Sequence, residues 1–226
     1  MAERVVLTYF DGRGKMESIR WLLTAAGVDF DEVFLTKRED YQQLLDDGSL
    51  MFQQVPLVEI DGMKLIQTKA ILNYIAEKYN LHGKDLKDRV KINMYSEGLM
   101  DLMEMILMLL WTPDEDRETK VKNIKTKTKE RYLPVFEKAL AGTKYLVGGR
   151  MSMADVLLLE CSLILEEEFP GIICESSNIK SFQTRMTQIP TFAKFLQPGS
   201  KKKPPHDENF KKTVRELFFI TVPLRP

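Results

Sequence analysis

The signals for β-strands in this sequence all lie before residue 80, and only helical patterns follow. Four short apolar runs predict the strands, at residues 4–9, 31–35, 57–60 and 63–66. A helical pattern at residues 16–26 separates the first two runs, and another at residues 69–78 follows the last. The order is β-α-β, a polar connector, then β-β-α, which predicts a small mixed sheet at the start of an otherwise helical chain.

The pair Asp61-Gly62 stands between the last two runs and is the strongest hairpin signal in the chain. Pro56 directly precedes the hairpin, and a residue before proline is pushed toward extended backbone. We therefore expect Val55 to be extended where it enters the sheet. A β-α-β unit followed by β-β-α, with a proline at the hairpin entrance, is typical of the thioredoxin-like fold. We expect an α/β domain of that kind followed by an all-α domain.

The second part of the chain is expected to be helical throughout. The longest patterns run over residues 86–111 and 118–140, and Pro134 predicts a kink or break in the second. Ser152 and Asp155 form a capping-box pattern before an apolar helix, which we interpret as a folding signal. Shorter patterns predict the remaining helices, at residues 177–187, 191–196 and 209–220.

These patterns predict one domain at residues 1–79, a linker at residues 80–85 and a second domain at residues 86–226. Residues 201–205, KKKPP, combine lysine with proline. We interpret them as a solvated spacer, and an anion-binding tract is the alternative.

Composition limits the classes of function. The 33 basic and 33 acidic residues give no net charge, which argues against nucleic acid or an anionic membrane as an obligatory partner. Cys161 and Cys174 form no CxxC motif and the histidines are scattered, so we expect neither a metal site nor a redox dithiol. No signal peptide is visible, and the apolar stretch 99–111 is interrupted by Asp101 and Glu104 and too short to span a bilayer. These features favour a cytoplasmic location.

Six stretches together resemble the alpha class of cytosolic glutathione transferases. They are LTYFDGRGKMESIRWLL, FQQVPLVEIDGMKLIQTKAILNYIA, the region of Asp101, the pair Arg131-Tyr132, SMADV and FLQPGS. The resemblance covers both expected domains. It implies a thioredoxin-like glutathione-binding domain of order β-α-β-α-β-β-α, and a helical domain with a hydrophobic substrate site and a C-terminal lid helix.

The resemblance also implies the activity. The enzyme would conjugate the thiolate of glutathione, its co-substrate, to small hydrophobic electrophiles as a homodimer, with no other cofactor. Heterodimers within the class, peroxidase activity on organic hydroperoxides and, more weakly, steroid isomerase activity are implied too. The alternative is a ligandin-like binding protein for hydrophobic anions with little turnover.

Two residues are implied in catalysis. By resemblance, the Tyr9 hydroxyl donates a hydrogen bond to the glutathione sulfur, although a tyrosine at a strand end is most often a packed aromatic. Lowering a thiol pKa from about 8.5 by about two units requires roughly 2.7 kcal/mol, and one charge-assisted hydrogen bond contributes about 1.5 to 3 kcal/mol. Lys15 stands where the class typically has arginine, so the cation is kept but the planar fork is not. An exposed lysine at a helix start is the alternative.

The resemblance assigns further contacts with glutathione. A cis bond between Val55 and Pro56 would expose the Val55 backbone to pair with the cysteinyl part. Gln67 and Thr68 would hold the γ-glutamyl carboxylate at a helix start, where Thr68 could equally cap the helix. The class usually presents an arginine to the glycyl carboxylate, but this chain has Leu45 there. Gln54 or a nearby lysine could substitute, or the affinity for glutathione is lower.

Other assigned residues involve a second subunit. By resemblance, Asp101 and Arg131 face the glutathione bound by the neighbouring protomer, whereas an exposed helical turn would explain Asp101 equally. Phe52 would insert into a pocket of the partner to which Met94 and Phe136 contribute, unless it packs under its own domain.

The hydrophobic substrate site is implied only by position, since most apolar residues at helical spacing are simply core. Trp111 is bulky for its place and predicts a narrower site. The implied residues are Phe10, Leu107, Met108, Leu110, Trp111, Val214, Phe218 and Ile220.

Overall fold

The structure is a computed structural model and describes residues 4–218. Its described residues form two compact units. One contains the residues up to Tyr74 and those from Pro198 onward, and the other runs from Ile75 to Gln197. The first unit thus also contains the C-terminal segment, which the sequence did not suggest.

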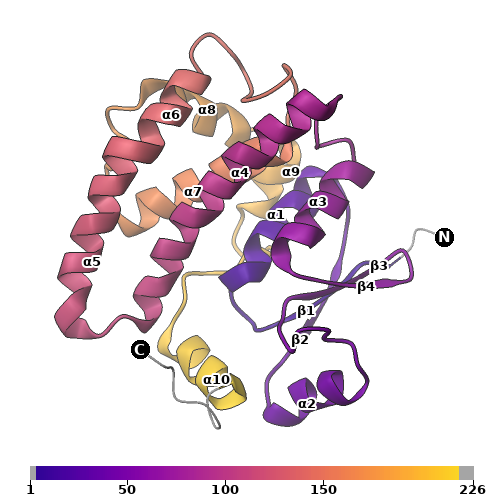
Figure 1. Cartoon of the computed structure of the whole chain (residues 1–226). Coiled ribbons are helices and arrows are strands. Elements are labelled where there is room, and N and C mark those ends of the chain that lie inside the picture. Colours follow the sequence, from indigo (N-terminus) through magenta and orange to yellow (C-terminus); the bar gives the residue numbers. More distant parts are fainter. Residues whose placement is uncertain (1–3, 219–226) are drawn as a thin grey trace. The chain divides into compact units, whose positions relative to one another are not determined.

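The sheet of the first unit has four strands in the order β2-β1-β3-β4 (Figure 1). Their bounds are Val6–Tyr9 (β1), Asp31–Phe34 (β2), Leu57–Ile60 (β3) and Met63–Ile66 (β4). β1 is parallel to β2 and antiparallel to β3, which pairs antiparallel with β4. The expected hairpin is confirmed, because Asp61 and Gly62 have φ angles of 53° and 70°, the left-handed pair that a type I′ turn requires.

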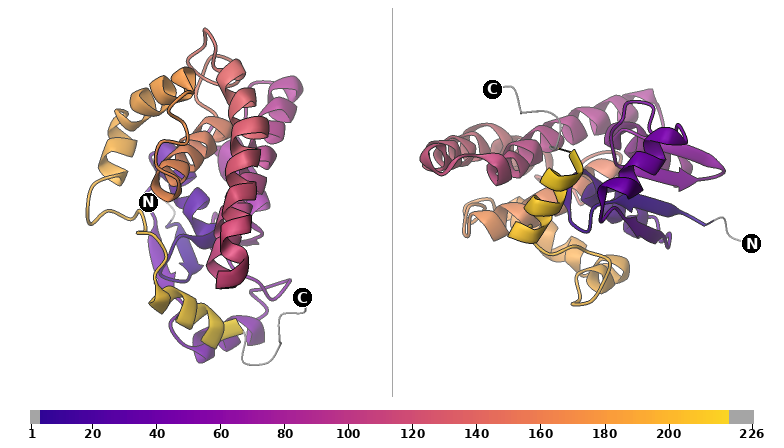
Figure 2. Two further views of the ribbon diagram at one scale, coloured as in Figure 1. Left: turned by 90° about the vertical axis from the view of Figure 1, so that its left-hand side faces the viewer. Right: turned by 90° about the horizontal axis from the view of Figure 1, so that it is seen from below.

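Helices accompany this sheet. They are η1 (Gly14–Met16), α1 (Glu17–Ala25), α2 (Arg38–Asp46), α3 (Thr68–Lys78) and α10 (Glu208–Phe218). The periodicities predicted α1, α3 and α10, whereas α2 lies in the polar connector, where only the resemblance implied a helix. α1 buries Ile19, Leu22 and Leu23, and α3 buries Ile71 and Leu72, so the repeating apolar positions form the core of the unit. α10 lies beside α2 in both views (Figures 1 and 2).

The second unit is helical. Its elements are α4 (Leu86–Leu107), η2 (Met108–Trp111), α5 (Asp114–Lys127), η3 (Thr128–Tyr132), α6 (Leu133–Ala139), α7 (Met153–Glu168), α8 (Ser177–Thr187) and α9 (Pro190–Phe195). The break expected at Pro134 is present as the π-helical turn η3, which directly precedes α6. Proline cannot donate to the helical ladder, and the wider turn accommodates that loss.

α7 is buried on almost every side and packs against α4, as expected for a helix that is apolar all round. The capping box at its start is confirmed. The Asp155 carboxylate accepts hydrogen bonds from the Ser152 N–H at 2.9 Å and from the Leu146 N–H at 2.8 Å. Asp155 therefore caps the helix and also holds the chain that leads into it.

The C-terminal strap, residues 198–207, corrects the interpretation of KKKPP as a solvated spacer. Lys203 is 13% exposed, and its ammonium lies 2.9 Å from Asp11 and 3.1 Å from Glu32. Its carbonyl accepts a hydrogen bond from Arg13 Nε at 2.8 Å, and its N–H donates to Glu17 at 3.2 Å. The strap is thus bound along the surface of the first unit.

The physical reason lies in a buried cation that has two acidic partners. Arg20 is fully buried and pairs with Glu17 and Glu32, each at 2.8 Å. One guanidinium cannot neutralise two carboxylates, and an uncompensated buried charge is costly. Lys203 supplies a second positive charge. No local sequence pattern predicts that this lysine is needed here.

Candidate active site

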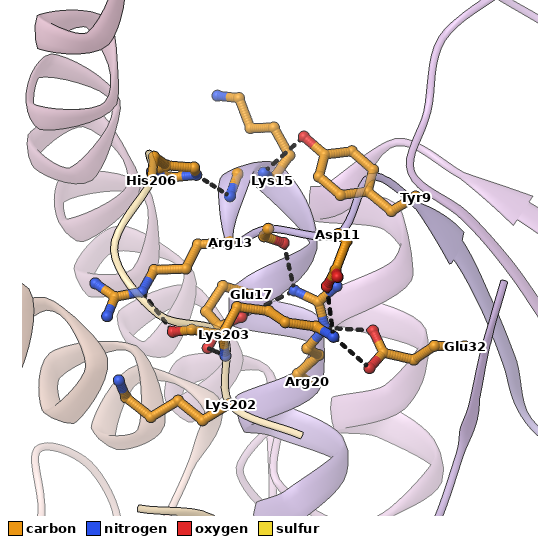
Figure 3. A network of polar contacts seen from close by, with 12 residues as sticks. Tyr9, Asp11, Arg13, Lys15, Glu17, Arg20, Glu32, Lys202, Lys203 and His206 are labelled. Carbon is orange, nitrogen blue, oxygen red and sulfur yellow. Dashed lines mark hydrogen bonds and ion pairs between the residues drawn. The ribbon is translucent and has the colours of Figure 1, made fainter. Parts of the chain in front are cut away.

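The Tyr9 hydroxyl lies at the centre of the candidate site, where β1 leads into the turn before α1. The Lys15 N–H donates a hydrogen bond to Tyr9 Oη at 3.0 Å (Figure 3). Gly14 has a φ of +43°, and a Cβ at this position would lie 2.4 Å from Tyr9 Oη. Only glycine allows the backbone to approach the hydroxyl so closely, so the turn is built around the phenol.

Burial controls the charge of this phenol. Burial raises the pKa of Tyr9 above its ordinary value, and the Lys15 amide and the Arg20 charge oppose the rise. The group therefore stays protonated at neutral pH. Since the Lys15 N–H already occupies one side of the oxygen, the hydroxyl keeps its own proton for another acceptor.

Lys15 places a cation on the turn whose backbone contacts the phenol. Its side chain is half-buried and extends away from the Tyr9 ring (Figure 3). Burial, followed by the nearby charge of Lys69, lowers the pKa of Lys15. The Lys15 carbonyl accepts a hydrogen bond from Thr68 Oγ1 at 3.3 Å. This contact links the turn to the start of α3 and gives Thr68 a role besides capping.

The loop before β3 lies in an unusual conformation. The bond between Val55 and Pro56 is cis, as expected. Within residues 4–218, the backbone N–H and C=O of Val55 have no hydrogen-bond partner, so they can pair with an extended ligand. Gln53 and Gln67 have φ angles of 54° and 69°. Left-handed residues other than glycine gather at functional sites.

Gln54 and Gln67 meet at this loop. Gln67 Nε2 donates to Gln54 Oε1 at 3.1 Å, and both side chains are exposed. The Gln67 carbonyl accepts the Ile71 N–H at 3.0 Å, so Gln67 directly precedes α3 and accepts its first helical hydrogen bond. The first amides of this helix, which favour an anion, follow directly. Leu45 is half-buried on α2 and offers no charge.

The residues assigned to a second subunit differ in exposure. Phe52 is 60% exposed and Met94 70% exposed, so Phe52 does not pack under its own domain. Phe136 is buried, with its ring centroid 5.7 Å from that of Tyr95. It belongs to the core of the second unit and could form only the floor of a pocket. Asp101 and Arg131 are exposed, on α4 and η3.

The residues assigned to the hydrophobic site fall in both units. In the first unit Phe10 and Val214 are buried and Phe218 is half-buried, whereas Ile220 lies outside the described residues. In the second unit Met108 is exposed, and the others are half-buried, namely Leu107, Leu110 and Trp111.

Sequence reasoning missed two residues of the strap and α10. Phe210 packs edge-on against Phe10 at 6.2 Å between ring centroids, and Gly12 leaves the room for its ring, because a Cβ there would lie 2.3 Å from it. His206 lies 4.3 Å from Phe210, centroid to centroid. Its Nε2 accepts a hydrogen bond from the Gly14 N–H at 3.0 Å. A lone histidine in a lysine- and proline-rich segment carries no signal for such a contact.

Two negative findings apply to residues 4–218. No helix in this range has the length and apolar character needed to cross a membrane. The same residues contain no group of three or more histidine, cysteine, aspartate or glutamate side chains arranged to hold a metal ion.

Comparison with known proteins links both units to one family. Residues 5–77 match the model for "Glutathione S-transferase, N-terminal domain", and residues 100–199 match that for "Glutathione S-transferase, C-terminal domain". The chain is 53% identical to glutathione S-transferase alpha I of Oryctolagus cuniculus, over 97% of this chain and 100% of that protein. It is 54% identical to glutathione S-transferase A3 of Homo sapiens, over 96% and 99%. A solved structure of monomeric Na-GST-3, a glutathione S-transferase from Necator americanus, has a TM-score of 0.76 at 25% identity, over 91% of this chain and 99% of that one.

Proposed function

This chain belongs to the alpha class of the glutathione S-transferase family, and we propose that it joins the glutathione thiolate to hydrophobic electrophiles at Tyr9. The observation that carries the proposal is the buried, protonated Tyr9 hydroxyl, which accepts the Lys15 N–H and retains its proton for the sulfur. A donor directed at a developing anion stabilises it most where water is excluded.

The reaction follows from this arrangement. The thiol of bound glutathione releases its proton to solvent, and the Tyr9 hydroxyl donates a hydrogen bond to the thiolate without ionising. The thiolate attacks the electrophilic carbon, a C–S bond forms, and the leaving group departs with its electron pair. The site lowers the barrier by holding the anionic sulfur in position. The same thiolate could attack an organic hydroperoxide.

Glutathione is proposed to bind along the first unit. Its cysteinyl backbone would pair with the N–H and C=O of Val55, and its γ-glutamyl carboxylate would lie at Gln67 and the start of α3. Gln54 would contact the glycyl end. Lys15 would add a positive charge near the sulfur, while Asp101 and Arg131 would complete the site of a neighbouring protomer.

Two assays on one preparation test this function. One follows conjugation of glutathione to a chlorinated nitroaromatic, and the other follows fluorescence quenching by a nonsubstrate hydrophobic anion. Turnover that depends on glutathione supports the transferase. Quenching without turnover would instead identify a binding protein for hydrophobic anions. The free Cys161 and Cys174 are compatible with the reducing cytoplasm proposed as its location.

Leu45→Arg is expected to lower the dissociation constant of glutathione about 10-fold. The arginine would restore a charged partner for the glycyl carboxylate, and such contacts contribute about 1.5 to 3 kcal/mol. Isothermal titration with glutathione measures the change. Leu44→Arg is the matched control, because it adds the same charge one position earlier on α2. Equal affinity for wild type and Leu45→Arg would show that the missing arginine has no consequence.

Phe52→Ser is expected to dissociate the proposed homodimer. Burying a phenylalanine side chain contributes about 1.5 to 3 kcal/mol, and a two-fold dimer would lose this contribution twice, so the dissociation constant should rise at least 100-fold. Sedimentation equilibrium measures the change. Val33→Ser, which removes another exposed apolar side chain, should leave the mass unchanged. A wild-type protein that is a monomer, as Na-GST-3 of Necator americanus is, would contradict the proposal.

A further inference from the structure

His206 connects the C-terminal strap to the turn that carries the Tyr9 hydrogen bond. Its Nε2 accepts the Gly14 N–H at 3.0 Å, across a separation of 192 residues in the sequence (Figure 3). The next amide along the chain, that of Lys15, donates to Tyr9 Oη at 3.0 Å. Successive N–H groups of one turn are therefore engaged by His206 and by the phenol.

The hydrogen bond from Gly14 to His206 restrains the backbone at the most flexible residue of the turn. Glycine is the most permissive residue, and Gly14 lies in the left-handed region with its α-carbon against Tyr9 Oη. His206 fixes the peptide group on one side of Gly14, and the phenol contacts the peptide group on the other. Without the imidazole, the Lys15 N–H can tilt away from Tyr9.

The imidazole is itself held firmly. Its ring packs against Phe210 with an angle of 50° between the ring planes, and Phe210 in turn packs against Phe10. Lys203, three residues earlier in the strap, pairs with Asp11 and Glu32. The strap therefore presents Nε2 to Gly14 in one position.

We propose that His206 is a positioning residue for Tyr9: it orients the turn whose Lys15 amide aligns the phenol toward the glutathione sulfur. This inference rests on the proposed function of Tyr9. A hydroxyl that accepts a well-aligned hydrogen bond is a stronger donor, because bonds in a chain polarise one another. His206 does not contact the sulfur in this scheme.

The contact requires a neutral imidazole. Nε2 accepts a hydrogen bond only when the ring proton is on Nδ1, and the imidazolium carries a proton on both nitrogens. Protonation of the ring therefore removes this acceptor.

The test compares His206→Leu with His206→Gln. Leucine keeps bulk and removes the acceptor, whereas the glutamine amide oxygen can accept the Gly14 N–H at any pH. The pKa of bound glutathione is measured by ultraviolet absorbance of the thiolate, together with kcat and KM from pH 5.5 to 8. We expect His206→Leu to raise the thiol pKa by about 0.5 to 1 unit and to lower kcat with little change in KM for glutathione.

His206→Gln should restore the thiol pKa of wild type, because the glutamine amide oxygen can accept the Gly14 N–H. A thiol pKa in His206→Leu equal to that of wild type would overturn the proposal, as would a His206→Gln that behaves like His206→Leu. If His206→Leu does not fold, His206→Ala replaces it as the variant that lacks the acceptor. His82→Gln is the control, because the chain has only these two histidines and His82 pairs with Glu77 and Asn93 in the second unit.

Tyr9→Phe separates this inference from the function on which it rests. If Tyr9→Phe leaves the thiol pKa unchanged, the proposed role of Tyr9 fails and the role of His206 fails with it. If Tyr9→Phe raises the thiol pKa and His206→Leu does not, only the inference about His206 fails. Adding His206→Leu to Tyr9→Phe should cause no further rise, because the two residues act through one hydrogen bond.

Discussion

Tyr9→Phe is expected to lower kcat/KM for conjugation by about 10- to 150-fold and to raise the pKa of bound glutathione by about 1 to 2 units. The substitution removes one hydrogen bond to an anionic sulfur, which contributes about 1.5 to 3 kcal/mol. The ring and its packing against Phe10, 5.0 Å between centroids, would remain. Steady-state kinetics and the ultraviolet absorbance of the thiolate measure the two effects.

The fold should survive this change, because the Lys15 N–H that Tyr9 Oη accepts lies in a half-buried turn within reach of solvent. Tyr79→Phe is the matched control, since it removes a phenol from a half-buried position at the end of α3. A Tyr9→Phe protein with the velocity of wild type would contradict the proposed mechanism.

Asp155→Ala is expected to lower the free energy of unfolding by about 2 to 5 kcal/mol at pH 7.5. The Leu146 and Ser152 amides and the Ser152 hydroxyl all donate to this carboxylate, at 2.7 to 2.9 Å, and all three bonds are buried. Each buried donor left without a partner costs about 1 to 3 kcal/mol. Urea denaturation followed by far-ultraviolet circular dichroism measures the loss.

Asp85→Ala provides the comparison within the same unit. Asp85 is the N-cap of α4 and accepts the Asp88 N–H at 2.9 Å, but it is exposed. Its loss should therefore cost only about 0.5 to 2 kcal/mol, the usual effect of removing a cap. Equal losses for the two variants would show that burial of Asp155 adds nothing.

The stability that Asp155 contributes should also depend on pH. Burial raises the pKa of Asp155 to about 6, whereas an unfolded aspartate titrates near about 3.9. The folded state therefore holds the proton more tightly. The stability gained from this proton is complete below about pH 4 and is lost as the pH rises through 6, by about 3 kcal/mol, whereas the hydrogen bonds to the carboxylate remain at pH 7.5. In Asp155→Ala, the free energy of unfolding should no longer fall between pH 4 and 6 in this way. If the variant shows the same pH dependence as wild type, another group causes it.

Local patterns predicted the elements well where a few neighbouring residues determine the backbone. The Asp61-Gly62 turn, the two strands beside it and the α8 bounds agree with the structure because hairpin and helix signals act within a few residues. The pattern for α5 missed its first turn, which begins at Asp114, because Asp114, Glu115 and Asp116 carry no apolar period.

The sequence predicted only part of the candidate site. Tyr9 and Lys15 are close in the chain, so a short turn brings them together. The contacts of His206 and Lys203 with that turn and with α1 join opposite ends of the chain. No periodicity or spacing encodes such pairings, because they depend on how the strap lies on the first unit. The need for a second cation beside Arg20 can be inferred only once Arg20 is known to be buried.

The strap also has a consequence for synthesis on the ribosome. Glu17, Arg20 and Glu32 emerge early, but Lys203 emerges only after almost the whole chain has been made. Until translation is nearly finished, the nascent chain thus lacks the ammonium group that pairs with Asp11 and Glu32. The ion pairs of the first unit can therefore be completed only after its C-terminal segment has been made.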